Sequence, residues 1–409
     1  MMKRILLVIL VSASFQTQPL HCSDWPQWRG PNRNGKSTET GLLKEWPQSG
    51  PRLIWTKKGL GGGYSSPSVS MQRIVGSGYV DGDEFIWALD ENSGQEVWRQ
   101  KVAEAETNVG YGDGPRSTPT IDKNLIFTLS AGGEITCLHL TKGRMFWQRN
   151  LKKEFGGRMM SGWGFSESIL VDGRQVICTP GGRQGTVLAL HRSTGRVLWQ
   201  SRDLKDDAAY TSLIKVTIGG KEQYVVLTEK TLAGIQPQNG KVLWKAKRHG
   251  ETAVIPTPIY YENEIFVTSG YNVGCNLFRI TPGPRFTVQE IYKNKNIKNH
   301  HGGVIQLEDY LYASNGPVLV CMEMKTGKVA WKQRSVGKGS LSYADGHLYL
   351  RSENGSVALV EANPSRFVEK SRFHQPYRSG NKSWAHPVIA NGQLYLRDMG
   401  TLLCFNLKE

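Results

Sequence analysis

The sequence predicts an all-β fold, an eight-bladed β-propeller made of four-stranded antiparallel blades. Three observations lead to this prediction. A Gly-x-x-x-Trp motif recurs along the chain, short apolar runs alternate with Gly and Asx turns, and an outer strand near the front lacks a sheet of its own. No stretch shows sustained helical periodicity. Short strands in groups of four at a period of about 40–50 residues are typical of propeller blades.

The motif sets the period of the repeat. Its tryptophans lie on predicted outer strands at Trp55, Trp98, Trp147, Trp199, Trp244 and Trp331. The first five are 43, 49, 52 and 45 residues apart, and the last interval of 87 residues spans two repeats. Degenerate copies without Trp at 282–288 and 363–368 bring the number of outer strands to eight. We expect the indoles to pack between neighbouring blades, which is a structural role.

The same four-strand pattern can be followed inside a unit and at the ends of the chain. In the second unit the strands are predicted at 117–122, 125–130, 134–140 and 144–149. The last unit has predicted strands at 393–396 and 401–407 but no fourth strand, whereas the strand ending at Trp55 has no partners before it. Pairing of these segments would close the ring and leave no open sheet edge.

The composition agrees with a large β-sheet core. The chain has 39% apolar residues, 46 Gly and 12 Trp among its 409 residues. Three of the six cysteines, Cys137, Cys321 and Cys404, fall on the third strand of their blades. Other blades carry a small residue at this position, namely Ala88, Ala189 or Gly234. Equivalent positions in different blades are too far apart to bridge, so we expect mostly reduced thiols.

The N-terminus predicts export. Lys3 and Arg4 precede an apolar run at 5–11 and then small residues, which is the order of an export signal and too short for a membrane-spanning helix. A buried first strand is the alternative. We therefore expect a signal peptide at 1–23, an N-terminal lead-in segment at 24–49 and the propeller at 50–409. The predicted location is periplasmic or extracytoplasmic, with association to the outer membrane and lipidation of Cys22 left open.

The chain is basic, with a formal charge of +16 from 51 Lys and Arg against 35 Asp and Glu. A basic surface favours anionic partners such as lipid headgroups, acidic glycans or acidic proteins. It also serves solubility. No Lys- or Arg-rich run of the kind that binds nucleic acid is present, so no specific nucleic-acid partner is predicted. We expect a monomer.

Two segments carry a family resemblance. Ala-Leu-Asp-x-x-Ser-Gly-x-x-x-Trp at 88–98 and Ala-Leu-His-x-x-Thr-Gly-x-x-x-Trp at 189–199 resemble the pyrroloquinoline-quinone (PQQ)-type repeat of quinoprotein alcohol dehydrogenases and of BamB-type outer-membrane assembly proteins. The lead-in Asp-Trp-Pro-Gln-Trp-Arg-Gly-Pro at 24–31 is similar to that of bacterial PQQ-binding-like propeller proteins. The resemblance covers residue 50 to the C-terminus. It implies the fold and does not establish a cofactor or an activity.

Aligning the first strands of the blades predicts a funnel around the central axis. Ionisable and aromatic residues near these strand starts are the ligand-binding candidates: Tyr64, Tyr111, Arg116, Glu167, Tyr210, His300, His301, Trp384 and His386. The alternative is a solvated funnel in which charges pair with each other, such as Arg116 with Glu167. Because adjacent residues of a strand face opposite ways, we expect one of His300 and His301 to point away, and no metal site is predicted.

Three functions compete at this stage. The BamB-type resemblance implies an exported, non-enzymatic binding or assembly scaffold of the cell envelope that recognises a protein partner through its rim and loops, such as 101–114 and 152–164. A PQQ-dependent dehydrogenase would need calcium held by acidic and amide ligands and an Asp base. By resemblance it would also carry two adjacent cysteines, which the sequence lacks. The third candidate is a polyanion- or glycan-binding propeller. We predict no cofactor and no catalytic residue.

Overall fold

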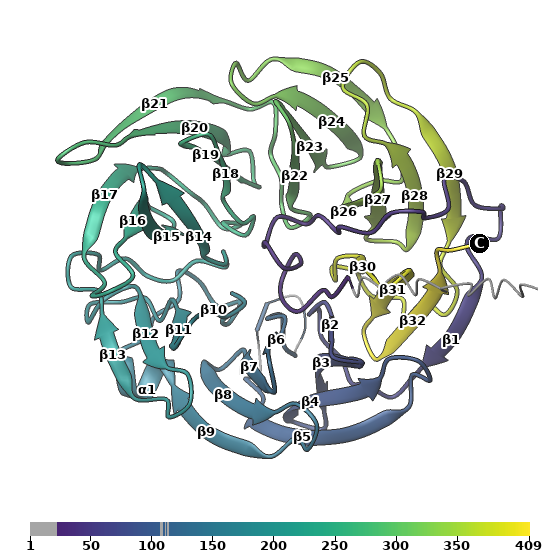
Figure 1. Ribbon diagram of the computed structural model, residues 1–409, viewed down its shortest axis with the longest axis horizontal. Coiled ribbons are helices and arrows are strands. Elements are labelled where there is room, and N and C mark those ends of the chain that lie inside the picture. Colours follow the sequence, from purple (N-terminus) through teal and green to yellow (C-terminus); the bar gives the residue numbers. More distant parts are fainter. Residues whose placement is uncertain (1–22, 107–108, 111, 113) are drawn as a thin grey trace, which may run out of the picture.

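Eight four-stranded antiparallel sheets surround a central axis, so the predicted eight-bladed propeller is confirmed (Figure 1). The structure is a computed structural model that describes residues 23–106, 109–110, 112 and 114–409. The predicted signal peptide lies almost entirely outside the described residues. Within the described ranges no helix has the length and apolarity needed to cross a membrane.

The first four blades follow the chain, each running from the axis outward in sequence order. Blade one contains β2 Ser68–Ser70, β3 Arg73–Val80, β4 Asp83–Asp90 and β5 Glu96–Glu104. Blade two contains β6 Thr120–Asp122, β7 Leu125–Leu129, β8 Glu134–His139 and β9 Met145–Asn150. Blade three contains β10 Leu170–Asp172, β11 Gln175–Cys178, β12 Leu188–His191 and β13 Val197–Gln200. Blade four contains β14 Ile214–Ile218, β15 Lys221–Leu227, β16 Thr231–Ile235 and β17 Val242–Lys247.

The remaining blades continue the same order until the eighth, which takes its outer strand from the front of the chain. Blade five contains β18 Ile259–Tyr261, β19 Glu264–Ser269, β20 Gly274–Thr281 and β21 Thr287–Asn294. Blade six contains β22 Val304–Leu307, β23 Tyr310–Asn315, β24 Val318–Glu323 and β25 Val329–Arg334. Blade seven contains β26 Gly339–Ala344, β27 His347–Ser352, β28 Ser356–Glu361 and β29 Glu369–His374. Blade eight contains β30 Val388–Ala390, β31 Gln393–Asp398, β32 Thr401–Asn406 and β1 Leu53–Lys57.

Two details of secondary structure differ from the sequence-based prediction. The outer strand of blade seven begins at Glu369, so the strand predicted at 363–368 is wrong. Asn363 begins a turn there, because its side-chain oxygen accepts a hydrogen bond from the Ser365 amide at 2.9 Å. The single described helix, α1 Leu151–Phe155, was not predicted, since five residues are too few to show a helical period.

The blade tryptophans pair with the small residues of the third strands. Each indole lies directly opposite one of them in the antiparallel register: Trp98 opposite Ala88, Trp147 opposite Cys137, Trp199 opposite Ala189, Trp244 opposite Gly234, Trp331 opposite Cys321 and Trp55 opposite Cys404. A larger side chain would take the space of the ring. This pairing explains why cysteine occurs at the position, and all five described cysteines are buried free thiols, as predicted.

Four of these indoles also cover the turn of the next blade. Each packs over the motif glycine: Trp55 over Gly94, Trp98 over Gly143, Trp147 over Gly195 and Trp199 over Gly240. The Trp98 indole N–H also donates to the carbonyl of Leu140 in blade two, at 2.8 Å. The corresponding Trp147 donates to Arg192 of blade three. The tryptophans therefore join neighbouring blades, as the repeat predicted.

The ring closes where the sequence predicted. Strand β1 pairs antiparallel with β32, with Trp55 opposite Cys404 and Lys57 opposite Leu402. Trp55 then packs over Gly94 of blade one, so the same short strand joins the last blade to the first. The sheet of blade eight therefore joins residues about 350 positions apart in the chain. Bringing such distant segments together costs conformational entropy, which the closed ring must offset.

The lead-in segment crosses the centre of the ring, as the purple trace in Figure 1 shows. Trp25 exchanges two backbone hydrogen bonds with Val69 of β2, at 2.8 and 2.9 Å. Farther along, the Ser37 amide donates to the carbonyl of Tyr343 in β26. Arg29 donates to the Val304 carbonyl of blade six, and the segment is thereby fixed to inner strands on opposite sides of the axis.

We expect a substitution of Gly94 by alanine to weaken the ring closure. Gly94 has a φ of 66°, and a Cβ there would lie 2.7 Å from the Trp55 ring. Gly82→Ala is the matched control, because Gly82 has a φ of 88° but open space around it. Both variants carry similar left-handed backbone strain, and we expect Gly94→Ala to lose about 1–3 kcal/mol more in urea unfolding. Equal losses would contradict the packing of Trp55 on blade one.

Candidate functional site

The predicted funnel is a pocket on the central axis. Seven of the nine candidates line it, namely Tyr64, Arg116, Tyr210, His300, His301, Trp384 and His386. The space inside it, counted together with the solvent at its open end, is about 780 Å³. Tyr111 lies outside the described residues. Whether this pocket binds a ligand remains a prediction.

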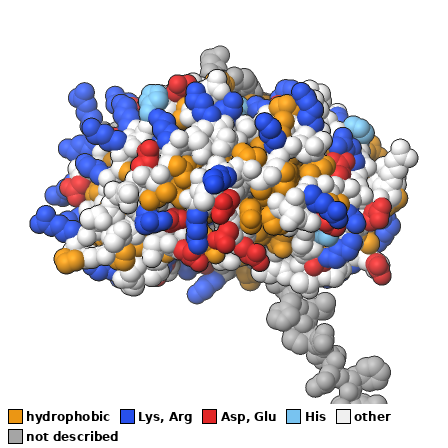
Figure 2. Space-filling view, turned by 90° about the horizontal axis from the view of Figure 1, so that it is seen from above, with side chains coloured by type: hydrophobic (Ala, Val, Ile, Leu, Met, Phe, Trp, Pro, Cys, Tyr) orange, Lys and Arg blue, Asp and Glu red, His pale blue; other side chains and the backbone are white. Residues whose placement is uncertain are grey.

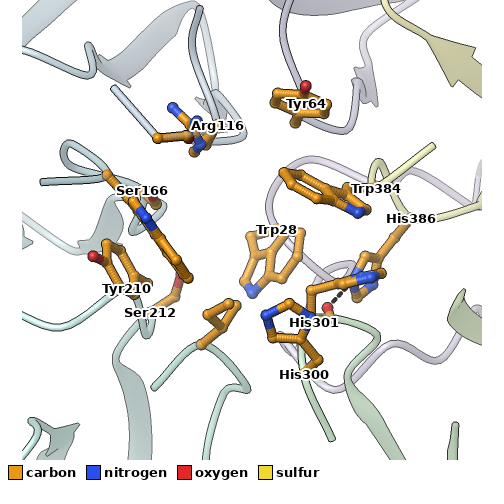
Figure 3. A pocket seen from close by; sticks show the side chains of 13 residues that line it. Trp28, Tyr64, Arg116, Ser166, Tyr210, Ser212, His300, His301, Trp384 and His386 are labelled. Carbon is orange, nitrogen blue, oxygen red and sulfur yellow. Dashed lines mark hydrogen bonds between the residues drawn. The ribbon is translucent and has the colours of Figure 1, made fainter. Parts of the chain in front are cut away.

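The lead-in segment supplies the floor of the pocket. Figure 3 shows Trp28 in the middle of the ring of side chains contributed by the blades. Its indole N–H donates to the Thr257 hydroxyl at 2.9 Å, and its ring contacts His386 with centroids 4.5 Å apart. Beside it, Arg29 is buried and donates to the carbonyls of Asn34 and Val304. The pocket is therefore closed at one end by a segment that does not belong to the repeat.

Aromatic rings form much of the wall. Trp163 and Tyr210 are stacked at an interplanar angle of 25° with centroids 5.3 Å apart. On the other side Tyr64 and Trp384 lie 4.5 Å apart at 37°. The Arg116 guanidinium lies over the Tyr64 ring, 5.5 Å from its centroid. These surfaces offer flat apolar faces with polar edges, which suit a ligand that combines apolar and hydrogen-bonding groups.

Both His300 and His301 line the pocket, so the expectation that one would point away is wrong. The alternation of side chains applies within a strand, whereas β22 begins only at Val304 and both histidines precede it. Their ring centroids are 5.4 Å apart. The third histidine, His386, bonds through Nε2 to the His301 carbonyl at 2.9 Å, the dashed line in Figure 3.

Glu353 organises one side of the pocket from blade seven. One of its carboxylate oxygens accepts hydrogen bonds from His301 Nε2 at 2.9 Å and from Trp384 Nε1 at 2.8 Å. Lys338 Nζ lies 3.1 Å from the same oxygen. Burial raises the pKa of Glu353, but the hydrogen bonds from His301 and Trp384 outweigh it and leave the pKa well below the usual value. Glu353 is therefore ionised.

A metal-ligand geometry exists among these residues but the charges oppose it. Ligand atoms of His300, His301 and Glu353 lie within 4.8 Å of one another. However, Lys338 lies beside the carboxylate, and Lys382 Nζ is 3.9 Å from its other oxygen. The carboxylate oxygen nearest His301 already has three donors around it. We therefore interpret the group as a hydrogen-bonded cluster and not as a metal centre.

The pocket histidines are neutral at physiological pH. Burial lowers the pKa of His386 to about 3, and the charge of Arg29 adds to this effect. Burial also lowers the pKa of His300 to about 3, with contributions from His301 and Lys338. Because neutral His386 donates through Nε2 to a carbonyl, its Nδ1 carries a lone pair. These imidazoles offer hydrogen bonds without adding positive charge to the pocket.

Glu167 and Arg116 do not form the ion pair that the solvated-funnel alternative proposed. Glu167 is 2% exposed, does not line the pocket, and accepts a hydrogen bond from the Thr179 amide. Burial raises its pKa to about 7, although the nearby charge of Arg33 lowers it in part. Arg116 instead donates to the carbonyls of Gly110 and Gly112, at 2.7 and 2.9 Å. The prediction of Glu167 as an axial residue fails because Ser166 beside it takes the inward direction.

Six lining residues were missed by the sequence analysis: Trp28, Gly110, Trp163, Ser166, Ser212 and Ile255. Five of them fall within segments aligned as first strands of the blades, so position in the repeat was the available signal for Gly110, Trp163, Ser166, Ser212 and Ile255. Trp28 lies outside the repeat, and no sequence pattern indicated that it would reach the axis.

The lowered histidine pKa values predict a pH-dependent stability. Between pH 6.5 and 3 the unfolded chain protonates His386 while the folded protein does not, so the free energy of unfolding falls as the pH falls. We expect His386→Gln to reduce this slope by about 1 kcal/mol per pH unit, measured by urea unfolding across that window. The control is His249→Gln, at a side chain 73% exposed, which should leave the slope unchanged. An unaltered slope in His386→Gln would contradict the burial of a neutral imidazole.

Relatives with known structures share this architecture. BamB from Moraxella catarrhalis superposes with a TM-score of 0.61 at 11% identity, covering 87% of this chain and 98% of that protein. Quinohemoprotein alcohol dehydrogenase from Comamonas testosteroni gives a TM-score of 0.66 at 10% identity, covering 94% and 80%. At such identities these similarities show the fold alone.

Sequence comparison gives the family. BamB of Shewanella oneidensis is 23% identical over 354 residues, 84% of this chain and 73% of that protein. BamB of Escherichia coli is 26% identical over 145 residues, 35% of this chain and about a third of the E. coli protein. The family model described as "Outer membrane protein assembly factor BamB" matches residues 37–161, 82–315 and 285–366, together more than half of the chain. The chain therefore belongs to the BamB family of β-propeller proteins, as the repeat resemblance suggested.

Proposed function

We propose that this protein is an exported, non-enzymatic scaffold of the cell envelope that binds a protein partner through its rim and loops. The observation that carries the proposal is the family match over residues 37–366, to a family described as an outer membrane assembly factor. The identity to its relatives is low, so the partner itself is not given by the match. The surface of the propeller indicates where a partner would bind.

The outer strands of four neighbouring blades carry exposed apolar side chains, and Val329 of β25 in blade six is exposed as well. We call the set on the four neighbouring blades the apolar rim; its residues are Ile54, Val97, Met145, Phe146 and Val197, each between 36% and 43% exposed. They belong to β1, β5, β9 and β13, the outermost strands of blades eight, one, two and three. Outer strands also leave backbone groups open on one side. Apolar side chains beside an open strand edge favour contact with another protein.

Phe146 is the strongest anchor of the apolar rim. Its ring is 42% exposed, and the Arg144 guanidinium lies 5.1 Å from its centroid. His139 contacts the same ring, with centroids 5.9 Å apart. Aromatic and arginine side chains dominate the binding energy of many protein interfaces, so this cluster is the first place to test.

Site-specific photo-crosslinking in cells tests the scaffold function. We expect a photoreactive phenylalanine at position 97 or 146 to give one discrete protein adduct, and Phe146→Asp to abolish the adduct formed from position 97. Position 377 is the control, because Tyr377 is 53% exposed but lies outside the apolar rim. The same adducts from all three positions, or none from the rim, would refute the proposed contact.

The residues of the pocket do not fit the calcium–quinone chemistry of a dehydrogenase. Among the described lining residues none carries a carboxylate or a side-chain amide, the oxygen ligands that calcium prefers. Glu167 faces the Thr179 amide, and Glu353 is held by His301, Trp384 and Lys338. The sequence also lacks the adjacent cysteines expected from the dehydrogenase resemblance. We therefore propose that the protein works without a bound quinone.

Reconstitution checks this part of the proposal directly. The full chain is incubated with PQQ and calcium, separated from free cofactor, and examined by visible absorption and dye-linked alcohol oxidation. We expect no stoichiometric cofactor and no turnover, because no described lining residue supplies a carboxylate or a side-chain amide for calcium. Stoichiometric uptake with alcohol oxidation would establish the dehydrogenase alternative in place of the scaffold.

A further inference from the structure

A second hollow opens beside the axial pocket and shares His300 and Trp384 with it. Three lysines line this hollow, Lys298, Lys338 and Lys382, and we call it the lysine cleft. The lysines come from segments that precede blades six, seven and eight. Residues far apart in the chain therefore converge on one opening next to an aromatic pocket.

The lysine cleft carries an excess of positive charge. Its three ammonium groups face a single described carboxylate, that of Glu353. Lys338 Nζ lies 3.1 Å from this carboxylate and Lys382 Nζ lies 3.9 Å from it. Lys298 donates to the Asn272 side-chain oxygen at 3.0 Å and forms no ion pair with a described acid. Since Glu353 is also held by His301 and Trp384, the cleft retains net positive charge for an anionic group.

Some lysines elsewhere on the surface are paired with acids. Figure 2 shows Lys and Arg side chains spread over the face in view, with Asp and Glu side chains among them. Lys325, for example, lies 2.9 Å from Glu262 and 3.4 Å from Asp309. Lys215 likewise contacts both Asp172 and Glu222. An anion would gain more from the lysine cleft, where three lysines share one carboxylate, than from lysines paired in this way.

The adjoining pocket fits the ring of a sugar. Trp28 and His386 meet at 53°, and Tyr64 and Trp384 meet at 37°. The aromatic rings that line the pocket offer apolar faces on which the C–H groups of a sugar ring can pack. Around these faces lie the hydroxyls of Ser166 and Ser212, which can bond to sugar hydroxyls. The histidines of the pocket are neutral, so they place no charge beside the sugar ring, which is itself uncharged.

We propose that the axial pocket and the lysine cleft together bind an anionic saccharide. Its ring packs on Trp28 and Trp384, and its carboxylate or sulfate lies among Lys298, Lys338 and Lys382. Trp384 connects the two parts, because it lines both hollows and its indole N–H is fixed on Glu353. This proposal is independent of the apolar rim, which lies on the outer strands, and either can fail without the other.

Titrations with defined disaccharides test the proposal on the full chain. The probes are a glucuronate-containing disaccharide, a sulfated disaccharide, a neutral disaccharide, sodium sulfate and oligo(dT), followed by calorimetry and tryptophan fluorescence. We expect at least one acidic disaccharide to bind with a dissociation constant below about 1 mM, and to bind at least about tenfold more tightly than the neutral one. The affinity should fall as salt is raised, since the lysines contribute through charge.

Two pairs of variants assign the binding to the proposed residues. We expect Lys298→Gln with Lys382→Gln to weaken the acidic disaccharide about tenfold and to flatten the salt dependence. The matched control is Lys293→Gln with Lys295→Gln, at exposed lysines outside both hollows. Trp28→Ala should also weaken binding, whereas Tyr377→Ala should not, because only Trp28 lines the pocket.

Several results would overturn the proposal. These are the absence of binding by every acidic disaccharide, equal binding of the neutral disaccharide, and equal losses in the two lysine pairs. Sodium sulfate binding as tightly as the sulfated disaccharide would show a simple anion site without a sugar contact. Equal binding of oligo(dT) would show a general polyanion surface.

Discussion

The structure depends on the closure of the ring by strand β1. A propeller blade buries its faces only against its neighbours, so an open series of blades would expose two apolar sheet faces. Here β1 completes the sheet of blade eight through β32, and its Trp55 packs over Gly94 of blade one. One short strand therefore supplies both the missing backbone pairing and the contact between the last and the first blade.

The lead-in segment turns the axial channel of the closed ring into a pocket. A ring of eight sheets by itself encloses an axial channel, and the segment before β1 crosses that channel and is bonded to inner strands on different sides. Because the crossing brings Trp28 onto the axis, the channel becomes a pocket with an aromatic floor. The lead-in segment that forms the pocket floor is followed directly in the chain by the strand that closes the ring. The buried Arg29 fixes the lead-in segment to blade six.

The described lining of the pocket lacks the carboxylate and side-chain amide ligands that calcium–quinone chemistry needs. A shared propeller does not carry a shared activity, since function depends on the residues that line the axis. Here the described lining consists of aromatic rings, neutral histidines, serines and one arginine, with a carboxylate held at the border by three donors. The proposed scaffold function assigns recognition to such a lining and protein contact to the separate apolar rim.

The sequence by itself determined the repeat, the number of blades, the closing strand and seven residues of the pocket. These follow from local patterns, because strand alternation, turn residues and the opposition of Trp to a small residue recur in each unit. The outer strand of blade seven was misplaced where the motif had lost both its Gly and its Trp. Only the tertiary structure decided the orientation of individual side chains at the axis. Glu167 turns away beside Ser166, both His300 and His301 face inward ahead of their strand, and Trp28 arrives from outside the repeat. These outcomes rest on contacts between segments up to hundreds of residues apart, which no local pattern encodes.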